Sequence, residues 1–164
     1  PLGDLSCRIR AQRDLGASPD GLAGLPEAEV VSYSHDVASG LAFLHSLRPK
    51  VLHRDVKPAN VVLFPAQGAQ SALPRAKLAD FGIAKVLEAE GTWAGAATVI
   101  GTPHYFAPEL CRGERYDEAA DAWALGCVLY EMLCLHRPFH NAEANIAALA
   151  IRIAEGRYDR EALE

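Results

Sequence analysis

The residues best suited to chemistry lie in one short polar stretch, VLHRDVKPAN, at positions 51–60 of this 164-residue chain. Five polar or charged side chains gather there: His53, Arg54, Asp55, Lys57 and Asn60. An ordinary surface turn has no need for such a density of charged and amide groups. A loop that holds a hydroxyl, a phosphate and a metal ion together does need it. This stretch is therefore the first candidate site.

Three further short motifs follow this stretch along the chain. They are Asp80-Phe81-Gly82, Ala107-Pro108-Glu109 and Asp121-x-Trp123-x-x-Gly126. Each motif alone occurs by chance in unrelated proteins and predicts little. Their shared order and spacing after residues 53–60 give them weight.

Hydrophobic periodicity and turn residues predict a mostly helical chain. Helices are expected over residues 3–13, 26–47, 119–135 and 142–155, where apolar residues recur every three or four positions. The short apolar runs at 61–64 and 76–79, joined by a turn-rich insertion, predict a small β-hairpin. Residues 83–100 show no sustained period, and a long loop of this kind is usually functional.

Taken together, the motifs resemble the catalytic loop, metal-binding triplet, activation-segment end and central-helix signature of the protein kinase family. The resemblance implies a fold that is mainly α with a small β-hairpin, the large C-terminal lobe of a two-lobe α+β kinase. Residues 1–164 would form an incomplete domain, from the post-hinge helix to the helix αG region. The small lobe and the last helices are expected to be absent, because no Gly-x-Gly-x-x-Gly or Val-Ala-x-Lys precedes the loop. In isolation such a chain is expected to bind ATP poorly and to turn over little.

The same resemblance implies a role for each residue of the reaction site. Asp55 would accept or orient the proton of a substrate hydroxyl, and Lys57 would contact the γ-phosphate of ATP. Thr102 would form a hydrogen bond near both of them. Asn60 and Asp80 would supply oxygen ligands to Mg²⁺.

Residues near the nucleotide carry over as well. Asp4 would accept a hydrogen bond from a ribose hydroxyl, with an ordinary helix N-cap as the alternative. Val62 would form the apolar floor beneath the adenine. Ala79 would line the wall just before the metal ligand.

Three motif residues are expected to support the site without touching substrate. Gly82 would let the backbone turn after the metal ligand. Phe81 would pack into an apolar column under the site. Glu109 is expected to be a buried carboxylate whose usual Arg partner is missing from this chain.

The remaining two support residues concern the loop itself. His53 is expected to pack beneath the site, so a metal role for it is disfavoured. Asp121 would accept hydrogen bonds from the backbone around Arg54 and so hold the loop in shape. The alternative for Asp121 is a plain N-cap at the start of its helix.

Two features indicate the type of kinase and its regulation. Lys57 and Gly101-Thr102-Pro103 resemble Ser/Thr kinases rather than tyrosine kinases. Arg54 beside the catalytic Asp implies a phosphate on the activation segment, placed there by an upstream kinase or by autophosphorylation. Thr98 is the candidate acceptor and Thr92 a weaker one, with a plain loop residue as the alternative for Thr98.

Several longer stretches resemble the NIMA-related (NEK) kinases. They are GDLSCRIRAQR, DFGIAKVL, TVIGTPHYFAPEL and DAWALGCVLYEMLCLHRPF. The resemblance implies ATP and Mg²⁺ as cofactors and proteins as substrates. It also adds the nucleus, cytoskeleton and cilium to the possible locations.

Composition narrows the partners and the compartment. The formal net charge of −5 and the lack of a Lys/Arg cluster predict no nucleic-acid partner. The four cysteines show no C-x-x-C spacing, so a zinc site is not expected. Without a secretory signal or an apolar run of ~18 residues, no membrane association and a cytoplasmic setting are expected.

Functions from different classes stay open at this point. The first is an active Ser/Thr protein kinase, and the second is a non-catalytic kinase-like module that docks partners. The intact set of Asp55, Lys57, Asn60 and Asp80 favours the enzyme, because docking needs none of the four. A small-molecule phosphotransferase is disfavoured by residues 107–109 and the long activation segment, which suit peptide substrates.

Overall fold

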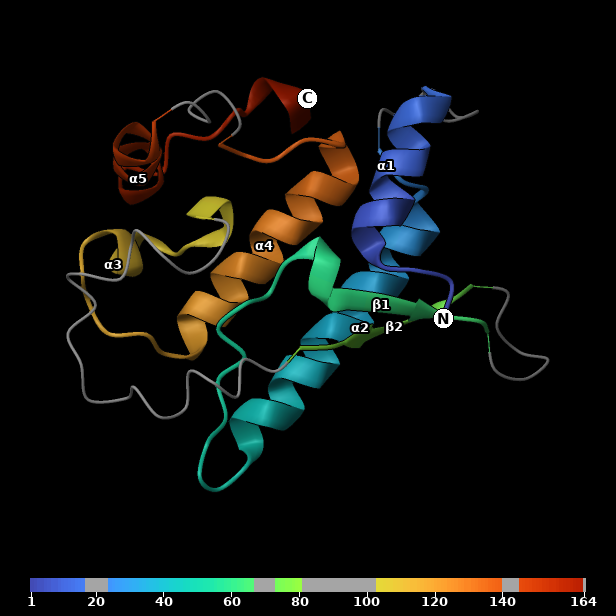
Figure 1. Ribbon diagram of the computed structural model, residues 1–164, viewed down its shortest axis with the longest axis horizontal. Coiled ribbons are helices and arrows are strands. Elements are labelled where there is room, and N and C mark those ends of the chain that lie inside the picture. Colours follow the sequence, from blue (N-terminus) through green and yellow to red (C-terminus); the bar gives the residue numbers. More distant parts are fainter. Residues whose placement is uncertain (17–23, 67–72, 81–102, 140–144, 164) are drawn as a thin grey trace.

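The computed structural model describes residues 1–16, 24–66, 73–80, 103–139 and 145–163. Within these ranges the helices and strands are α1 (Leu5–Leu15), α2 (Glu27–Ser46), β1 (Val61–Phe64), β2 (Arg75–Leu78), α3 (Pro108–Cys111), α4 (Glu118–Cys134) and α5 (Ile146–Ala154) (Figure 1). Short 3₁₀ turns cover 58–60, 103–105 and 161–163. The predicted fold class, mainly α with a small β-hairpin, is confirmed.

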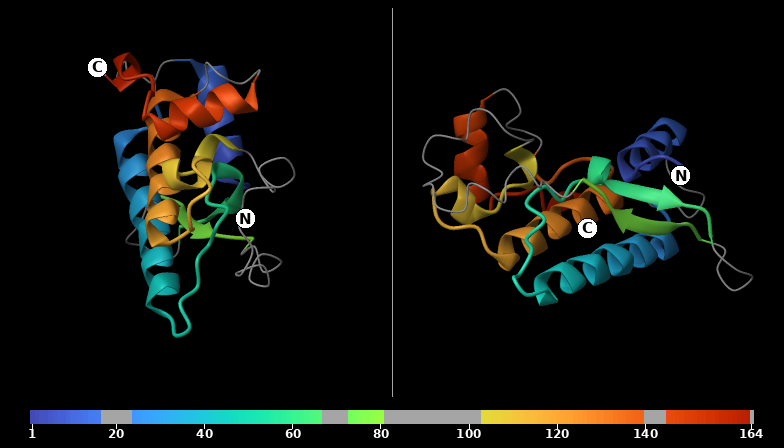
Figure 2. Two further views of the ribbon diagram at one scale, coloured as in Figure 1. Left: turned by 90° about the vertical axis from the view of Figure 1, so that its left-hand side faces the viewer. Right: turned by 60° about the horizontal axis from the view of Figure 1, so that its bottom comes forward.

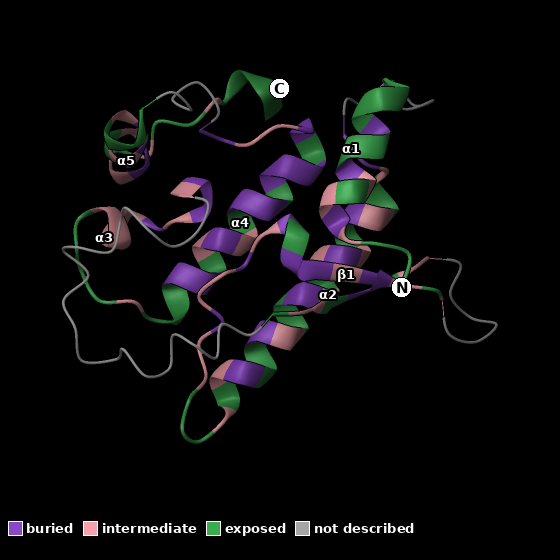
Figure 3. Cartoon of the chain, viewed as in Figure 1, coloured by how far each residue is buried: buried purple, intermediate pink, exposed green. Residues whose placement is uncertain are grey.

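Helix α4 runs through the middle of the described chain and carries its core. Helix α2 packs along one side of it, while α3 and α5 lie on the other (Figures 1 and 2). Val128 and Met132 of α4 are each 1% exposed, as are Tyr33 and Val37 of α2, and all four belong to one hydrophobic cluster (Figure 3). Fully burying a side chain of this size contributes roughly 1.5–3 kcal/mol. The central helix is thus a rigid base for whatever its ends hold.

The β-hairpin lies against α2 and is fastened to it by one carboxylate. Strands β1 and β2 are antiparallel, with Val61 opposite Leu78. Asp36 of α2 accepts hydrogen bonds from the Arg75 guanidinium (2.6 and 2.9 Å) and from the Ala76 backbone N–H (2.9 Å). Burial acts to raise the pKa of Asp36, but these hydrogen bonds outweigh it and the pKa is lowered. These hydrogen bonds fix Arg75 in place, so β2 begins at Arg75, one residue earlier than the sequence predicted.

The first residues of the chain cover the other edge of β1. The Leu2 N–H donates to the Leu63 carbonyl (2.7 Å), and the Leu63 N–H donates to the Gly3 carbonyl (2.9 Å). An antiparallel bridge then places Asp4 opposite Val62, immediately before α1 begins. Both edges of this short strand are therefore paired.

Helix boundaries differ from the predicted ones by a few residues, mostly because of caps. Helix α4 begins after Asp117, whose side chain accepts from the Ala119 N–H. It ends at Cys134, and the next residue, Leu135, has a left-handed φ of 57°. Helix α5 begins later than predicted, because Asn145 has an extended backbone and caps the N–H groups of the first turn.

Candidate active site

The predicted catalytic loop connects α2 to β1. Residues 51–57 have neither helix nor strand, and residues 58–60 form a 3₁₀ turn that leads directly into β1 (Figure 1). The loop is tied at its start by the Val51 N–H, which donates to the Leu44 carbonyl (3.2 Å). Its end is tied by the Asn60 N–H, which donates to the Lys57 carbonyl (2.9 Å). Both ends of the loop are therefore anchored to regular structure.

Two polar side chains of this loop, those of Lys57 and Asn60, donate to Asp55. The Lys57 ammonium donates to Asp55 Oδ2 at 2.8 Å. The Asn60 amide donates to the same oxygen at 2.9 Å and to the Asp55 backbone carbonyl at 2.8 Å. Side chains of Asp55 and Lys57 remain 28% and 22% exposed, so they are held in place yet open to a substrate. A carboxylate oriented in this way can hold a hydroxyl in line for attack.

Asn60 and Asp80 are brought to the same edge of the hairpin. The Ala79 N–H donates to the Asn60 carbonyl at 2.8 Å, and Asp80 is the next residue along the chain. Because the Asn60 side chain donates both its bonds through Nδ2, its amide oxygen is the remaining acceptor. The chain turns at Asp80, where φ is 54°, and Asp80 is exposed.

The side-chain oxygens of Asn60 and Asp80 are suitable ligands for Mg²⁺. Amide and carboxylate oxygens are hard ligands, and Mg²⁺ is usually bound through one or two carboxylates together with water and substrate phosphates. In the described ranges, no group of three or more His, Cys, Asp or Glu side chains forms a separate metal site. The predicted pair therefore suits a metal whose coordination is completed by phosphate oxygens.

Asp121 holds the loop from below and is fully buried, with 0% exposure. Its carboxylate accepts from the backbone N–H groups of His53 and Arg54, both at 2.9 Å. Tyr116 donates its hydroxyl to Oδ1 (2.6 Å), and His45 Nε2 lies 2.8 Å from Oδ2. The expected contacts to the backbone around Arg54 are present, whereas the N-cap of α4 is Asp117.

These bonds fix an unusual backbone conformation. Arg54 has a φ of 65°, in the left-handed region that non-glycine residues seldom adopt. Two backbone N–H groups bonded to one buried carboxylate stabilise that turn. The side chain of Arg54 lies over the Tyr116 ring, 5.8 Å from its centroid.

His53 is 1% exposed, and both nitrogens of its ring are in contact with backbone atoms. Its Nε2 lies 3.2 Å from the Ala79 carbonyl, and its Nδ1 lies 3.4 Å from the Asp55 N–H. Burial lowers the pKa of His53. A neutral ring that donates through Nε2 and accepts through Nδ1 satisfies both contacts, and it links the loop to the residue before Asp80.

Asp4 is the N-cap of α1, which was the alternative to a ribose contact. Its Oδ1 caps α1, accepting from the Cys7 N–H (2.9 Å) and the Ser6 hydroxyl (2.5 Å). Burial acts to raise the pKa of Asp4, but the hydrogen bonds from Ser6 and Cys7 lower it overall. Both contacts use Oδ1, and the bridge to Val62 keeps Asp4 beside the predicted adenine floor. A ribose contact through Oδ2 stays a prediction.

Glu109 differs from expectation. It lies in the first turn of α3, a four-residue helix without a buried residue, and is half-buried instead of buried. Its backbone carbonyl accepts from the N–H groups of Arg112 (3.2 Å) and Glu114 (2.8 Å). The expectation of a fully buried carboxylate is therefore wrong for this chain.

Five predicted residues lie outside the described ranges: Phe81, Gly82, Thr92, Thr98 and Thr102. Two contributors were missed by the sequence reasoning. His45 and Tyr116 reach Asp121 from the end of α2 and from the turn before α4. Their only signal in the sequence is a position close to the loop or to Asp121, which many other residues share.

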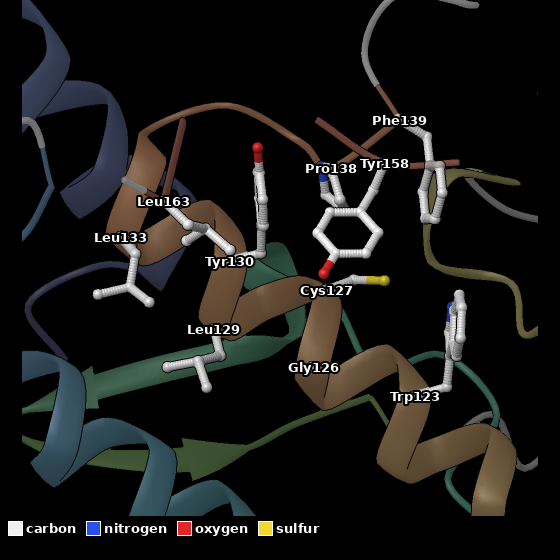
Figure 4. A pocket seen from close by; sticks show the side chains of 10 residues that line it. All are labelled: Trp123, Gly126, Cys127, Leu129, Tyr130, Leu133, Pro138, Phe139, Tyr158 and Leu163. Carbon is white, nitrogen blue, oxygen red and sulfur yellow. The ribbon is translucent and has the colours of Figure 1, made fainter. Parts of the chain in front are cut away.

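An apolar cavity lies on the opposite side of α4 from the catalytic loop. It has a volume of about 320 Å³ and is lined by Trp123, Gly126, Cys127, Leu129, Tyr130, Leu133, Pro138, Phe139, Tyr158 and Leu163 (Figure 4). The rings of Trp123 and Phe139 stack there, with centroids 6.2 Å apart. None of the residues predicted for the reaction lines this cavity, so it is separate from the candidate active site.

The sequence matches the family model of the protein kinase domain over residues 16–160. This chain belongs to the protein kinase family. The matched range of the kinase domain includes the loop around Asp55 together with Asn60, Asp80 and Asp121. The family relationship predicted from the four motifs is thus confirmed.

Named relatives narrow the group of kinases. The kinase chain is 41% identical over 133 residues to the probable serine/threonine-protein kinase nek3 of Dictyostelium discoideum, covering 80% of this chain and 11% of that protein. It is 39% identical over 132 residues to nekl-2 of Caenorhabditis elegans (80% and 33%). It is 36% identical over 156 residues to Nek5 of Homo sapiens (95% and 19%). The predicted similarity to NIMA-related kinases is confirmed, and the chain spans 11 to 33% of the length of these three relatives.

Among the helices of the described kinase residues, none combines the length and the apolar character needed to cross a bilayer.

Proposed function

We propose that this protein transfers the γ-phosphoryl group of ATP to Ser and Thr hydroxyls of protein substrates. The observation that carries the proposal is the convergence of Lys57 and Asn60 on one oxygen of Asp55, at 2.8 and 2.9 Å. Phosphoryl transfer has a loose transition state, so it depends on positioning and charge neutralisation more than on covalent help. This cluster supplies both.

Each residue has a role in the proposed reaction. Asp55 holds the substrate hydroxyl in line and takes its proton as the oxygen–phosphorus bond forms. Lys57 stabilises the negative charge on the phosphoryl oxygens while the bond to ADP breaks. Asn60 and Asp80 would hold Mg²⁺, which neutralises charge on the β- and γ-phosphates when bound.

The names of the relatives support the choice of Ser and Thr over Tyr, because all three are called serine/threonine-protein kinases or probable ones. By the same resemblance we propose a cytoplasmic protein that also reaches the nucleus, cytoskeleton or cilium. ATP and protein substrates are its proposed partners.

The test is phosphate transfer from labelled ATP by the full-length protein. Peptides that differ only in carrying Ser, Thr or Tyr as the acceptor are compared, with wild type, Asp55→Asn and the matched surface variant Asp14→Asn. We expect Ser and Thr to be labelled, and Asp55→Asn to lose at least about 100-fold in rate. Asp14 is exposed on α1, so Asp14→Asn is expected to behave as wild type. Equal rates for Asp55→Asn and wild type would contradict the proposal.

We also propose that Thr98 is the regulatory phosphorylation site, paired with Arg54. A phosphate there would form charge-assisted hydrogen bonds with the guanidinium and order the segment. Thr98→Ala is expected to lower the phosphorylation rate of a peptide substrate by about tenfold. Asp14→Asn, at an exposed position on α1, serves as the control. A rate for Thr98→Ala that matches the control would remove Thr98 from this role.

A further inference from the structure

Beside the candidate active site lies another cavity, in which four of the nine lining residues are Lys or Arg. It has a volume of about 520 Å³ and is lined by Ser6, Arg10, Arg13, Lys57, Pro58, Ala59, Tyr105, Glu131 and Arg137. The lining comes from α1, the catalytic loop, the turn at residue 105, and α4 with the segment after it. This cationic cavity shares Lys57 with the reaction site, so the two meet at that residue.

The one carboxylate in this lining is already engaged. Glu131 is 8% exposed and accepts the Tyr105 hydroxyl at 2.5 Å. Burial and the neighbouring Glu131 both raise the pKa of Tyr105, so Tyr105 stays a neutral donor to that carboxylate. With Glu131 held inside and Lys57 bonded to Asp55, Arg10 and Arg13 supply most of the charge that a ligand in the cavity meets.

The three arginines of helix α1 have different partners. Arg8 forms an ion pair with Glu29 of α2, with Nε 2.9 Å from the carboxylate. In the described part of the chain, neither Arg10 nor Arg13 lies within ion-pair distance of a carboxylate. Arg13 donates to the Leu135 carbonyl, and Arg10 lies 3.6 Å from the Cys7 sulfur, which is a weak acceptor. Arg10 and Arg13 are thus the arginines of α1 whose charge is offered to the cavity.

The size of the cavity suits a side chain of a bound polypeptide. A sphere of the same volume would be about 10 Å across, which is the length of roughly three extended residues. A peptide whose hydroxyl lies at Asp55 would therefore place a residue two or three positions away near Arg10. A single acidic side chain there would meet the guanidinium groups of Arg10 and Arg13.

We propose that the cationic cavity selects substrates with an acidic residue, Asp, Glu or a phosphorylated side chain, within a few positions of the accepting Ser or Thr. The inference rests on the proposed function, since it assigns a specificity to the same site. It makes Arg10 a specificity-determining residue outside the residues that carry out the transfer. The free energy comes from ion pairs in a half-enclosed site, so salt should weaken the selection.

The experiment moves a single Asp through a Ser peptide, from three positions before the acceptor to three after it. Each Asp peptide has a matched Asn peptide, and kcat/KM is measured for the full-length protein together with Kd by fluorescence anisotropy. We expect Asp to exceed Asn by about tenfold at one or two positions on one side of the acceptor. Arg10→Gln should reduce that ratio to about twofold or less, and 0.5 M NaCl should reduce it too.

Arg157→Gln is the matched control. Arg157 is 69% exposed and pairs with Glu155, away from the cationic cavity, so its removal should leave the Asp/Asn ratio unchanged. Arg10 is itself exposed on α1, so Arg10→Gln is expected to fold, and circular dichroism verifies this. Arg13 is less suitable as a test, because it also holds the Leu135 carbonyl.

The outcomes separate this inference from the proposed function. Phosphorylation of all peptides with equal Asp and Asn rates at every position would overturn the inference and leave the kinase activity standing. A preference for Lys over Asn would overturn it as well. Without any phosphorylation the proposed function fails, and the Kd values decide the inference: Asp peptides that bind no tighter than Asn peptides overturn it.

Discussion

At the scale of single residues, Asp121 connects more of the site than any of the residues expected to react. Its buried carboxylate accepts from two backbone N–H groups of the loop, while Tyr116 and His45 lie against the same oxygens. The left-handed φ of Arg54 exists because those two N–H groups point at one carboxylate. The position of Asp55, one residue later, depends on that turn.

Asp121→Asn removes one oxygen acceptor and replaces it with an NH₂ group that faces other donors. We expect a loss of about 3 kcal/mol in the free energy of unfolding, because a buried network is left with an unsatisfied group. The measurement is urea denaturation followed by circular dichroism. The control is Asp117→Asn on the same helix, which should change the free energy by less than about 0.5 kcal/mol because Asn caps as well as Asp. Equal effects of the two variants would show that Asp121 is merely another cap.

Most residues of the candidate site were predictable, and the reason is local. Asp55, Lys57 and Asn60 lie within six positions of one another, so short-range turn geometry suffices to bring them together. Residues that act across the fold were not predictable. His45 is separated from Asp121 by 76 positions, and their contact exists only because α2 packs beside α4.

The cationic cavity could likewise not be predicted from the sequence. Arg10 and Arg13 lie close together in the sequence, but Lys57 and Arg137, which line the same cavity, are 44 and 124 positions after Arg13. Residues so distant in sequence meet only when α1, the loop and the end of α4 come together. A count of charge along the chain cannot reveal such a patch.

At the scale of elements, the end of α4 is locked to the segment that enters α2. The Leu25 N–H donates to the Met132 carbonyl at 2.8 Å. A Cβ at Gly24 would lie 2.3 Å from the Leu133 carbonyl oxygen and 2.8 Å from that of Met132. Only glycine allows this approach, because backbone atoms of α4 cannot move aside as a flexible side chain would.

Gly24→Ala is therefore expected to destabilise the protein by about 3 kcal/mol, since it forces two backbones apart. Gly126→Ala provides the opposite case within α4, because a Cβ there would meet no described atom within 4 Å. That variant should be about 1 kcal/mol more stable than wild type, as alanine is the better helix former. Thermal unfolding of both variants tests the pair, and a Gly24→Ala protein as stable as wild type would refute the close approach.

Element types were predicted well, and their limits less well, for physical reasons. The apolar period of α2 and α4 is set by burial on a helix face and is visible in the sequence. Strand β2 starts at Arg75 because Asp36 binds its guanidinium, a contact between segments 39 positions apart. Asn145 could have been recognised as an N-cap from its residue type. The alanines just before it, however, continue the helical pattern, so the predicted start at residue 142 falls before the observed start of α5.

At the scale of the whole molecule, α4 divides two surfaces of different chemistry. On one side its first turn holds the catalytic loop through Asp121, and Glu131 near its end lines the cationic cavity. On the other side Leu129 and Leu133, 36% and 40% exposed, face the apolar cavity. One buried helix thus fixes the loop and the cationic cavity relative to each other, which lets a single peptide contact both.

The central claim is that Asn60 and Asp80 form the metal pair of a phosphoryl-transfer site. Its most direct test is the Mg²⁺ dependence of Ser phosphorylation by full-length wild type and Asp80→Asn. Asn tolerates the left-handed φ of 54° at this position, so the variant removes charge without disturbing the backbone. We predict a loss of at least about 100-fold in kcat and a higher Mg²⁺ requirement. A variant with the rate and the Mg²⁺ dependence of wild type would contradict the account.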